Sequence, residues 1–158
     1  MNTYLVIKWL HILSSVLMVG TGFGSAFYMF FANRSGSVAA QAVVARLVVR
    51  ADWWFTTPAV IFQPLSGLWL VHQAGWPWHT PWLALSSGLY AFAVLCWLPV
   101  VVLQIRMARL ADEAMTTGTP VHPAYWRMTW QWEALGYPAF VAMLSVYFLM
   151  VYKPALWQ

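Results

Sequence analysis

The sequence has very little charge. Only 8% of its 158 residues are Asp, Glu, Lys or Arg, and 62% belong to the apolar set AVILMFWYC. Soluble globular domains carry about 25% charged and about 45–50% apolar residues. The composition therefore excludes an ordinary soluble enzyme, intrinsic disorder and a nucleic-acid-binding module. It predicts an integral membrane protein that is embedded in a lipid bilayer.

Cysteine and the common catalytic motifs are also scarce. The single cysteine, Cys96, cannot form an internal disulfide and makes no metal site by itself. The sequence contains no Gly-x-Ser-x-Gly, no His-Glu-x-x-His and no Walker loop. Hydrolase and nucleotide chemistry have no support in these residues.

Long apolar runs predict four membrane-spanning helices. A bilayer core of about 30 Å needs about 20 apolar residues per helix. Such runs cover residues 4–31, 54–74, 82–105 and 126–152. The first run exceeds the apolar core of a secretory signal, so we expect it to be retained. The expected fold is all-α, a four-transmembrane-helix bundle forming one membrane domain over residues 1–158.

The segment 36–52 between the first two runs has a different character. Arg46 and Arg50 lie four residues apart, while apolar residues recur at helical spacing. This pattern predicts a short interfacial amphipathic helix, or an extension of the second span into the lipid head groups.

Basic residues predict the orientation. Six arginines belong to one side of the predicted bundle, and only Lys8 and Lys153 belong to the other. The arginines are Arg34, Arg46, Arg50, Arg106, Arg109 and Arg127. The positive-inside rule then places the arginines in the cytoplasm and both termini outside it, in a bacterial inner membrane. Predicted tryptophan belts are Trp9, Trp76, Trp78, Trp82 and Trp157 outside, with Trp53, Trp54, Trp126, Trp130 and Trp132 inside.

The first span has a polar and small face that should point into the bundle. His11 lies on it, and a neutral imidazole there is a candidate ligand for haem iron or a hydrogen-bond partner of a neighbouring helix. Met18 and Gly22 share the face and are candidate cofactor contacts. Gly20 and Gly24 form a Gly-x-x-x-Gly pair, which permits close helix packing.

The second span offers two further candidates. Gln63 lies on its inward face, where it would bind a quinone or porphyrin substituent or satisfy the helix broken by Pro64. His72, about 180° around the helix from Gln63, is a second-ligand candidate that requires the Pro64 kink to turn it inward.

A carboxyl group lies inside the fourth span. Glu133 must pair with a cation or take up a proton at that depth. Arg106 and Arg127 are its candidate partners, and proton handling from the cytoplasmic side is the alternative role.

Several short motifs carry a resemblance to known families. They are Lys8-Trp9-Leu10-His11-Ile12, Thr57-Pro58-Ala59, Gly67-Leu68-Trp69-Leu70 and Tyr152-Lys153-Pro154. These resemble the CopD/HemJ-like superfamily of small bacterial membrane proteins. Over nearly its whole length, the chain more specifically resembles an uncharacterised bacterial family of four-span integral membrane proteins, a domain of unknown function.

The resemblance implies a cofactor. HemJ-type members are protoporphyrinogen oxidases that bind haem b through a first-helix histidine, and that role falls on His11. The lysine of their third span has no counterpart between Trp82 and Ile105.

Two functional hypotheses follow. The first is a haem b- or porphyrin-binding membrane protein in electron transfer or porphyrin oxidation, with a quinone or a membrane redox partner, as in a HemJ-like oxidoreductase. The alternative is a cofactor-free assembly or packing subunit, whose partner is a larger membrane complex or a second copy of the chain.

Overall fold

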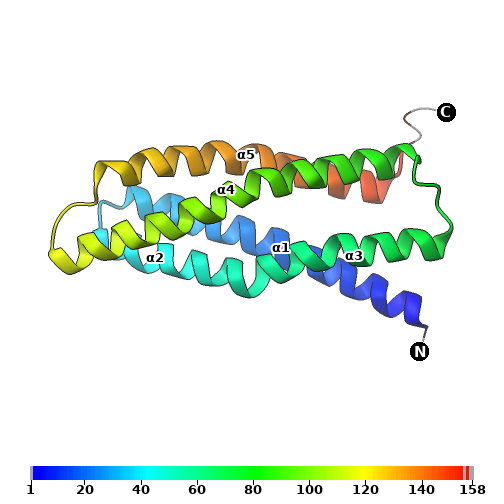
Figure 1. The fold of residues 1–158 in the computed structure, drawn as a ribbon, viewed down its shortest axis with the longest axis horizontal. Coiled ribbons are helices and arrows are strands. Elements are labelled where there is room, and N and C mark those ends of the chain that lie inside the picture. The colour runs from blue at the N-terminus through cyan, green and yellow to red at the C-terminus, as the bar shows by residue number, and fades with distance from the viewer. Residues whose placement is uncertain (1, 155, 157–158) are drawn as a thin grey trace.

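The protein consists of four antiparallel helical rods. The computed structural model describes residues 2–154 and Leu156, so Trp157 of the predicted outer belt lies outside the described residues. The helices are α1 (Thr3–Arg34), α2 (Val38–Ala51), the π-helix η1 (Asp52–Thr56), α3 (Thr57–Ala74), α4 (Pro81–Thr117) and α5 (Pro123–Tyr152). Because α2, η1 and α3 follow one another without a break, they form one rod (Figure 1).

Local sequence determines where the rods begin and end. Asn2 caps α1 by accepting a hydrogen bond from the Tyr4 amide, and Ser37 caps α2 in the same way. Proline occupies the first turn of α4 and α5, where its missing N–H costs nothing. Gly75 and Gly118 end α3 and α4 with positive φ, a conformation that glycine adopts without strain.

The two ends of the bundle differ in the helix connections that they contain. The beginning of α1 and the end of α5 lie beside the α3–α4 connection, while the α1–α2 and α4–α5 connections lie at the opposite end (Figure 1). All six arginines belong to the helix segments next to these two connections, which we call the Arg-rich end.

Packing is tightest at the Arg-rich end. There α2 packs against α1 and α4, and the core contains Met29, Ala45, Met107, Ala111 and Tyr125. Elsewhere α1 pairs with α3 and α4 pairs with α5, and α1 meets α5 at few points. The two helix pairs are therefore held together mainly by α2.

The predicted number of spans was partly wrong. Three described helices, α1, α4 and α5, are long and apolar enough to cross a membrane, whereas four spans were expected. The expected second span, residues 54–74, falls on η1 and α3. Its hydropathy is lowered by Gln63, Pro64, His72 and Gln73, so α3 does not reach the level of the other three.

The amphipathic segment is helical but is not a separate interfacial helix. α2 continues through η1 into α3, and it buries Ala42, Ala45 and Val48 in the core beside α4. The alternative that this segment prolongs the second helix agrees with the structure. Two belt assignments also fail, because Trp82 and Trp132 are buried in the bundle.

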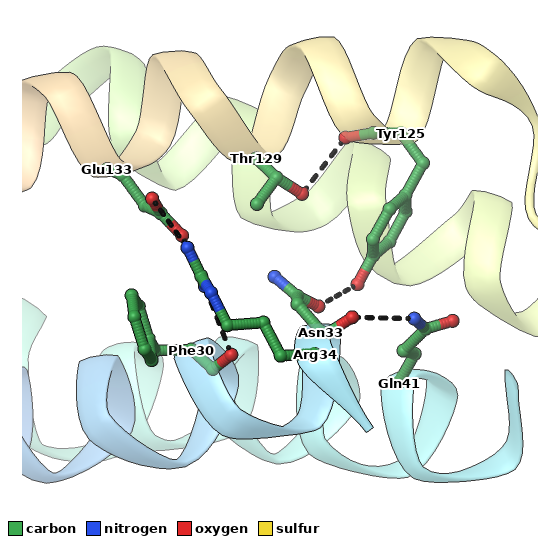
Figure 2. A network of polar contacts seen from close by, with 7 residues as sticks. All are labelled: Phe30, Asn33, Arg34, Gln41, Tyr125, Thr129 and Glu133. Carbon is green, nitrogen blue, oxygen red and sulfur yellow. Dashed lines mark hydrogen bonds and ion pairs between the residues drawn. The ribbon is translucent and has the colours of Figure 1, made fainter. Parts of the chain in front are cut away.

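A buried polar network joins three helices at the Arg-rich end (Figure 2). The Tyr125 hydroxyl donates to Asn33 Oδ1 at 2.6 Å, and Gln41 Nε2 donates to the Asn33 carbonyl at 3.2 Å. All three side chains are buried. Because buried polar groups are costly when unpaired, this network makes the α1–α2 connection and α5 mutually dependent.

We expect Tyr125→Phe to destabilise the protein by about 1–3 kcal/mol, since it leaves Asn33 Oδ1 buried without a donor. The measurement is the apparent Tm in detergent. Tyr152→Phe is the matched control, because the Tyr152 side chain is exposed. Equal Tm values for the two variants would contradict a structural role for the network.

Candidate functional site

A cavity of about 480 Å³ lies between the two helix pairs. Its walls come from α1, η1, α3, α4 and α5 and are mostly aromatic and aliphatic. On α4 the lining runs from Tyr90 to Gln104, which corresponds to about 21 Å along the helix axis. The cavity is thus long and narrow, and it follows the bundle axis.

Polar groups gather at the end of the cavity nearer the Arg-rich end. Asp52 and Gln104 line it there and are each only 4% exposed. Thr56 Oγ1 donates to Asp52 Oδ1 at 2.9 Å, and the Trp97 side chain lies beside the same carboxyl group. Glu133 also lines the cavity, and most of the remaining wall toward Tyr90 is apolar, so the cavity has one polar end and one mostly apolar end.

Four buried polar atoms of this region have no hydrogen-bond partner in the described part of the chain. They are Asp52 Oδ2, Gln104 Oε1, Trp97 Nε1 and Trp132 Nε1, and all four residues line the cavity. Native proteins rarely leave such atoms unpaired, because each costs about 1–3 kcal/mol. Trp97 and Gln104 lie within hydrogen-bonding reach of the Asp52 carboxyl group, so these residues form a polar cluster with incomplete hydrogen bonds that a ligand can share at one end of the cavity.

The π-helix explains why Asp52 faces inward. The Thr57 amide donates to the Asp52 carbonyl, five residues back, so this turn is wider than an α-turn. Asp52 and Thr56 are buried, whereas Trp53, Trp54 and Phe55 point outward. A π-turn inside a longer helix is frequent at functional sites.

Pro64 accounts for a hydrogen bond between α3 and α4 at the apolar end of the cavity. A proline has no N–H, so it leaves the carbonyl of the residue four before it, Val60, without its helical donor. The Tyr90 hydroxyl fills that role and donates to the Val60 carbonyl at 2.6 Å. Tyr90 and Val60 both line the cavity. The carbonyl that Pro64 leaves without a helical donor is thus paired with a side chain of α4 rather than with Gln63.

Glu133 lines the cavity and is paired with a cation. Arg34 Nη1 donates to Glu133 Oε1 at 2.9 Å, and Nη2 donates to Oε2 at 3.4 Å (Figure 2). The guanidinium group also lies 3.4 Å from the centre of the Phe30 ring. The prediction of Arg106 or Arg127 as the partner was wrong, because Arg34 of α1 supplies the cation. Arg127 lies six residues before Glu133 on α5 itself, on a different face of that helix.

The wall between α1 and α5 is thin. Phe23 stacks on Phe140 with ring centres 5.4 Å apart, and both line the cavity. Phe23, Phe27 and Tyr137 are lining residues whose side chains are more than half exposed. The cavity is therefore partly open to the surroundings of the bundle at this side, between aromatic side chains of α1 and α5.

Two of the residues predicted from the first span line this cavity, namely Met18 and Gly22. His11 does not; it lies between α1 and α3, where its Nδ1 is 2.8 Å from Ser66 Oγ. A Cβ added at Gly67 would lie 3.3 Å from His11 Cε1, so the absence of a side chain at Gly67 leaves room for the imidazole ring. The inward orientation expected for this face agrees with the burial of Ser14, Ser15 and Met18.

The two α3 candidates lie apart from the cavity. Gln63 is partly buried with its Oε1 unpaired, one turn before Ser66. His72 is exposed in the last turn of α3, about 9 Å further along the axis than Ser66. The fold does not bring His72 beside His11. No group of three or more His, Cys, Asp or Glu that would hold a metal ion occurs within residues 2–154 and 156.

Sequence reasoning missed the polar end of the cavity. Asp52, Trp97 and Gln104 come from two rods and are far apart in the chain. One local signal existed: Asp52 and Thr56 are spaced by four residues, which places two polar side chains on one helix face inside an aromatic run.

These features define an all-helical integral membrane protein with an internal cavity. Comparison with known families matches residues 5–154 to the family described as "Predicted integral membrane protein (DUF2269)". The match covers nearly the whole chain, and the chain belongs to this family. This confirms the resemblance to an uncharacterised membrane family, while the resemblance to the CopD/HemJ-like superfamily stays a prediction. No curated protein and no solved structure matches the chain.

Proposed function

We propose that the protein binds a lipid-soluble ligand of the quinone class in the central cavity. The observation that carries the proposal is the buried polar cluster of Asp52, Trp97, Gln104 and Trp132, whose hydrogen bonds are incomplete, at one end of a mostly apolar cavity. A quinone has the same division, with a polar ring at one end and an apolar tail. Ligand sites in proteins commonly combine apolar walls with a few placed polar groups.

The polar end offers partners for both redox forms of such a ligand. A quinone carbonyl accepts hydrogen bonds, which the indole N–H groups of Trp97 and Trp132 donate. A quinol hydroxyl donates, and Asp52 Oδ2 and Gln104 Oε1 accept. An anionic head group is disfavoured, because the Asp52 carboxylate would repel it.

The thin aromatic wall supports entry from the bilayer. The ligand would pass between α1 and α5, where contacts are few and where Phe23, Phe27 and Tyr137 form the wall. Aromatic side chains change rotamer without breaking hydrogen bonds, so this route costs less than separating α1 from α3.

The membrane topology is part of the proposal. η1 and α3 together would form the fourth crossing, since residues 52–74 are about 34 Å long, which suffices for the bilayer core. An even number of crossings agrees with the beginning of α1 and the end of α5 lying at one end of the bundle (Figure 1). By the positive-inside rule, the Arg-rich end would face the cytoplasm of a bacterial cell.

Removing one donor tests the proposal. We expect Trp97→Phe to weaken binding of decylubiquinone to the purified protein about 5- to 10-fold, since it loses one hydrogen bond and keeps the ring. Binding is measured by isothermal titration in detergent. Trp54→Phe is the matched control, because Trp54 is 77% exposed on the outer surface of η1. Absence of saturable binding to the unmodified protein would overturn the proposal.

Haem b on His11 is a second candidate, with electron transfer or porphyrin oxidation as its activity. The observation that favours it is the contact of Ser66 with Nδ1, which orients the ring and leaves Nε2 for a metal. The described structure supplies no partner histidine beside His11, so the residues fit one axial bond. Iron held there would supply one-electron chemistry. Glu133 pairs with Arg34, about 34 Å along α1 from His11, so any proton handling by Glu133 would be separate from this site.

The haem candidate predicts an absorption spectrum. Protein purified after expression with ample haem is expected to show a Soret band that shifts on dithionite reduction. His11→Ala should abolish that band, whereas His72→Ala should leave it unchanged because His72 is exposed and distant. A colourless protein would remove this candidate and leave the quinone proposal intact.

The cofactor-free assembly role rests on a different surface. A Cβ added at Gly20 or Gly24 meets nothing within 4 Å, so this face of α1 is open to a partner helix or to a second copy of the chain.

A further inference from the structure

We propose a second binding site, independent of the central cavity, that holds the phosphate group of an anionic phospholipid. The site is a pocket of about 360 Å³ at the Arg-rich end, between α4 and the beginning of α5. Its lining consists of two arginines, a histidine and three apolar side chains: Arg106, Arg109, Leu110, His122, Ala124 and Met128.

The two arginines of this pocket form no ion pair within the described residues. Arg106 and Arg109 lie one turn apart on α4 and are exposed. Asp112 is engaged by Arg46 and Glu133 by Arg34, and Glu113, four residues after Arg109, lies outside the pocket lining. The lining surface is almost entirely apolar, so the arginines line the pocket with their hydrocarbon stems, and their exposed guanidinium groups are placed to bind a phosphate group at its edge.

His122 adds a third donor. Its Nδ1 accepts a hydrogen bond from the Ala124 amide at 3.1 Å. In the neutral ring the proton then resides on Nε2, the only ring nitrogen left to donate.

The depth of the pocket favours a lipid over a free ion. Arg106 lies 25 residues after Pro81, the first residue of α4, or about 37 Å along the helix axis, which exceeds the hydrocarbon core by several ångströms and reaches the opposite head-group layer. Exposed Trp126 and Trp130 on α5 belong to the same layer. A free phosphate ion would require only the two arginines and not a position in the head-group layer.

The apolar part of the pocket gives the acyl chains a place. Leu110, Ala124 and Met128 line it beside the two arginines. A phospholipid joins a phosphate to hydrocarbon, and basic pockets between membrane helices are known to hold such head groups. Phosphatidylglycerol meets both requirements, and its net negative charge complements the arginine pair.

Native mass spectrometry of the full chain in detergent tests the site. The probe is phosphatidylglycerol, with phosphatidylcholine as the neutral comparison. We expect a one-to-one phosphatidylglycerol adduct, reduced at least fivefold in the R106Q/R109Q double variant and retained in R106K/R109K. R50Q is the control, because Arg50 is an exposed arginine at the same end but lies outside the pocket.

Three results would overturn the proposal. They are equal adducts in R106Q/R109Q and R50Q, equal adducts with phosphatidylcholine, and displacement of the lipid by millimolar inorganic phosphate. The last result would identify a simple anion site. Misfolding of the double variant would show as a lower apparent Tm, and the single variants R106Q and R109Q, each expected to reduce the adduct relative to R50Q, then decide.

Discussion

Asp52→Asn is expected to raise the Tm of the ligand-free protein and to weaken decylubiquinol binding at least tenfold. In the native protein the carboxyl group is almost fully buried, it accepts from Thr56 with Trp97 and Gln104 beside it, and no cation pairs with it within the described residues. A buried charge without a cation is costly, and an amide of the same shape removes that cost. The same change removes the strongest acceptor for a quinol hydroxyl.

The opposite signs of these two effects distinguish a ligand site from a structural site. Residues kept for binding are often locally destabilising, whereas a structural carboxylate loses stability when it is neutralised. Asp112→Asn is the control: Asp112 pairs with Arg46 outside the cavity, so its loss should lower the Tm slightly and leave binding unchanged. A lower Tm with unchanged binding in Asp52→Asn would contradict the proposed site.

The helical class of the fold was predictable because it depends on composition and on local runs. The expected limits of the first and fourth spans lie within α1 and α5. The third helix was expected to end near Ile105, yet α4 continues to Thr117 because Ala108 and Ala111 pack on α2 while Arg106 and Arg109 point outward. The stop signal is Gly118, which ends the helix with positive φ.

The joining of α2 to α3 was harder to predict. Sequence shows an arginine-containing amphipathic segment followed by an aromatic run, and both an interfacial helix and an extended rod fit that pattern. The π-turn at Asp52–Thr56 resolves the alternatives by inserting one residue, so that the buried face of α2 and the inward face of α3 remain aligned. No local propensity rule indicates such a turn.

The site required tertiary information. Met18 and Gly22 were predictable because the polar and small residues of the first span lie on one helix face. Arg34 and Glu133 are 99 residues apart, and nothing local relates them. A histidine is a candidate ligand by its residue type alone, so the sequence indicates His11 and His72. Asp52 becomes a candidate only when the fold brings it beside Trp97 and Gln104 from another rod.

Filling the cavity is expected to abolish ligand binding and to stabilise the fold at the same time. Gly22 on α1 and Gly136 on α5 both line the cavity, and a Cβ added at either meets nothing within 4 Å. Leucine at both positions should occupy the space that the ligand needs. Each Gly→Leu change also favours the helix by about 0.5–1 kcal/mol. We therefore expect a higher Tm and no saturable decylubiquinone binding in Gly22→Leu/Gly136→Leu.

Gly20→Leu supplies the matched control. Gly20 lies on the same helix, also has open space around its Cα, and does not line the cavity. It should gain the same helix stability and keep full binding. Light scattering on the same variant tests the assembly role: if Gly20 and Gly24 dock a second copy, leucine at position 20 splits the assembly while binding persists. Retained binding in Gly22→Leu/Gly136→Leu would place the ligand elsewhere, because the cavity between α1 and α5 would then be filled by side chains.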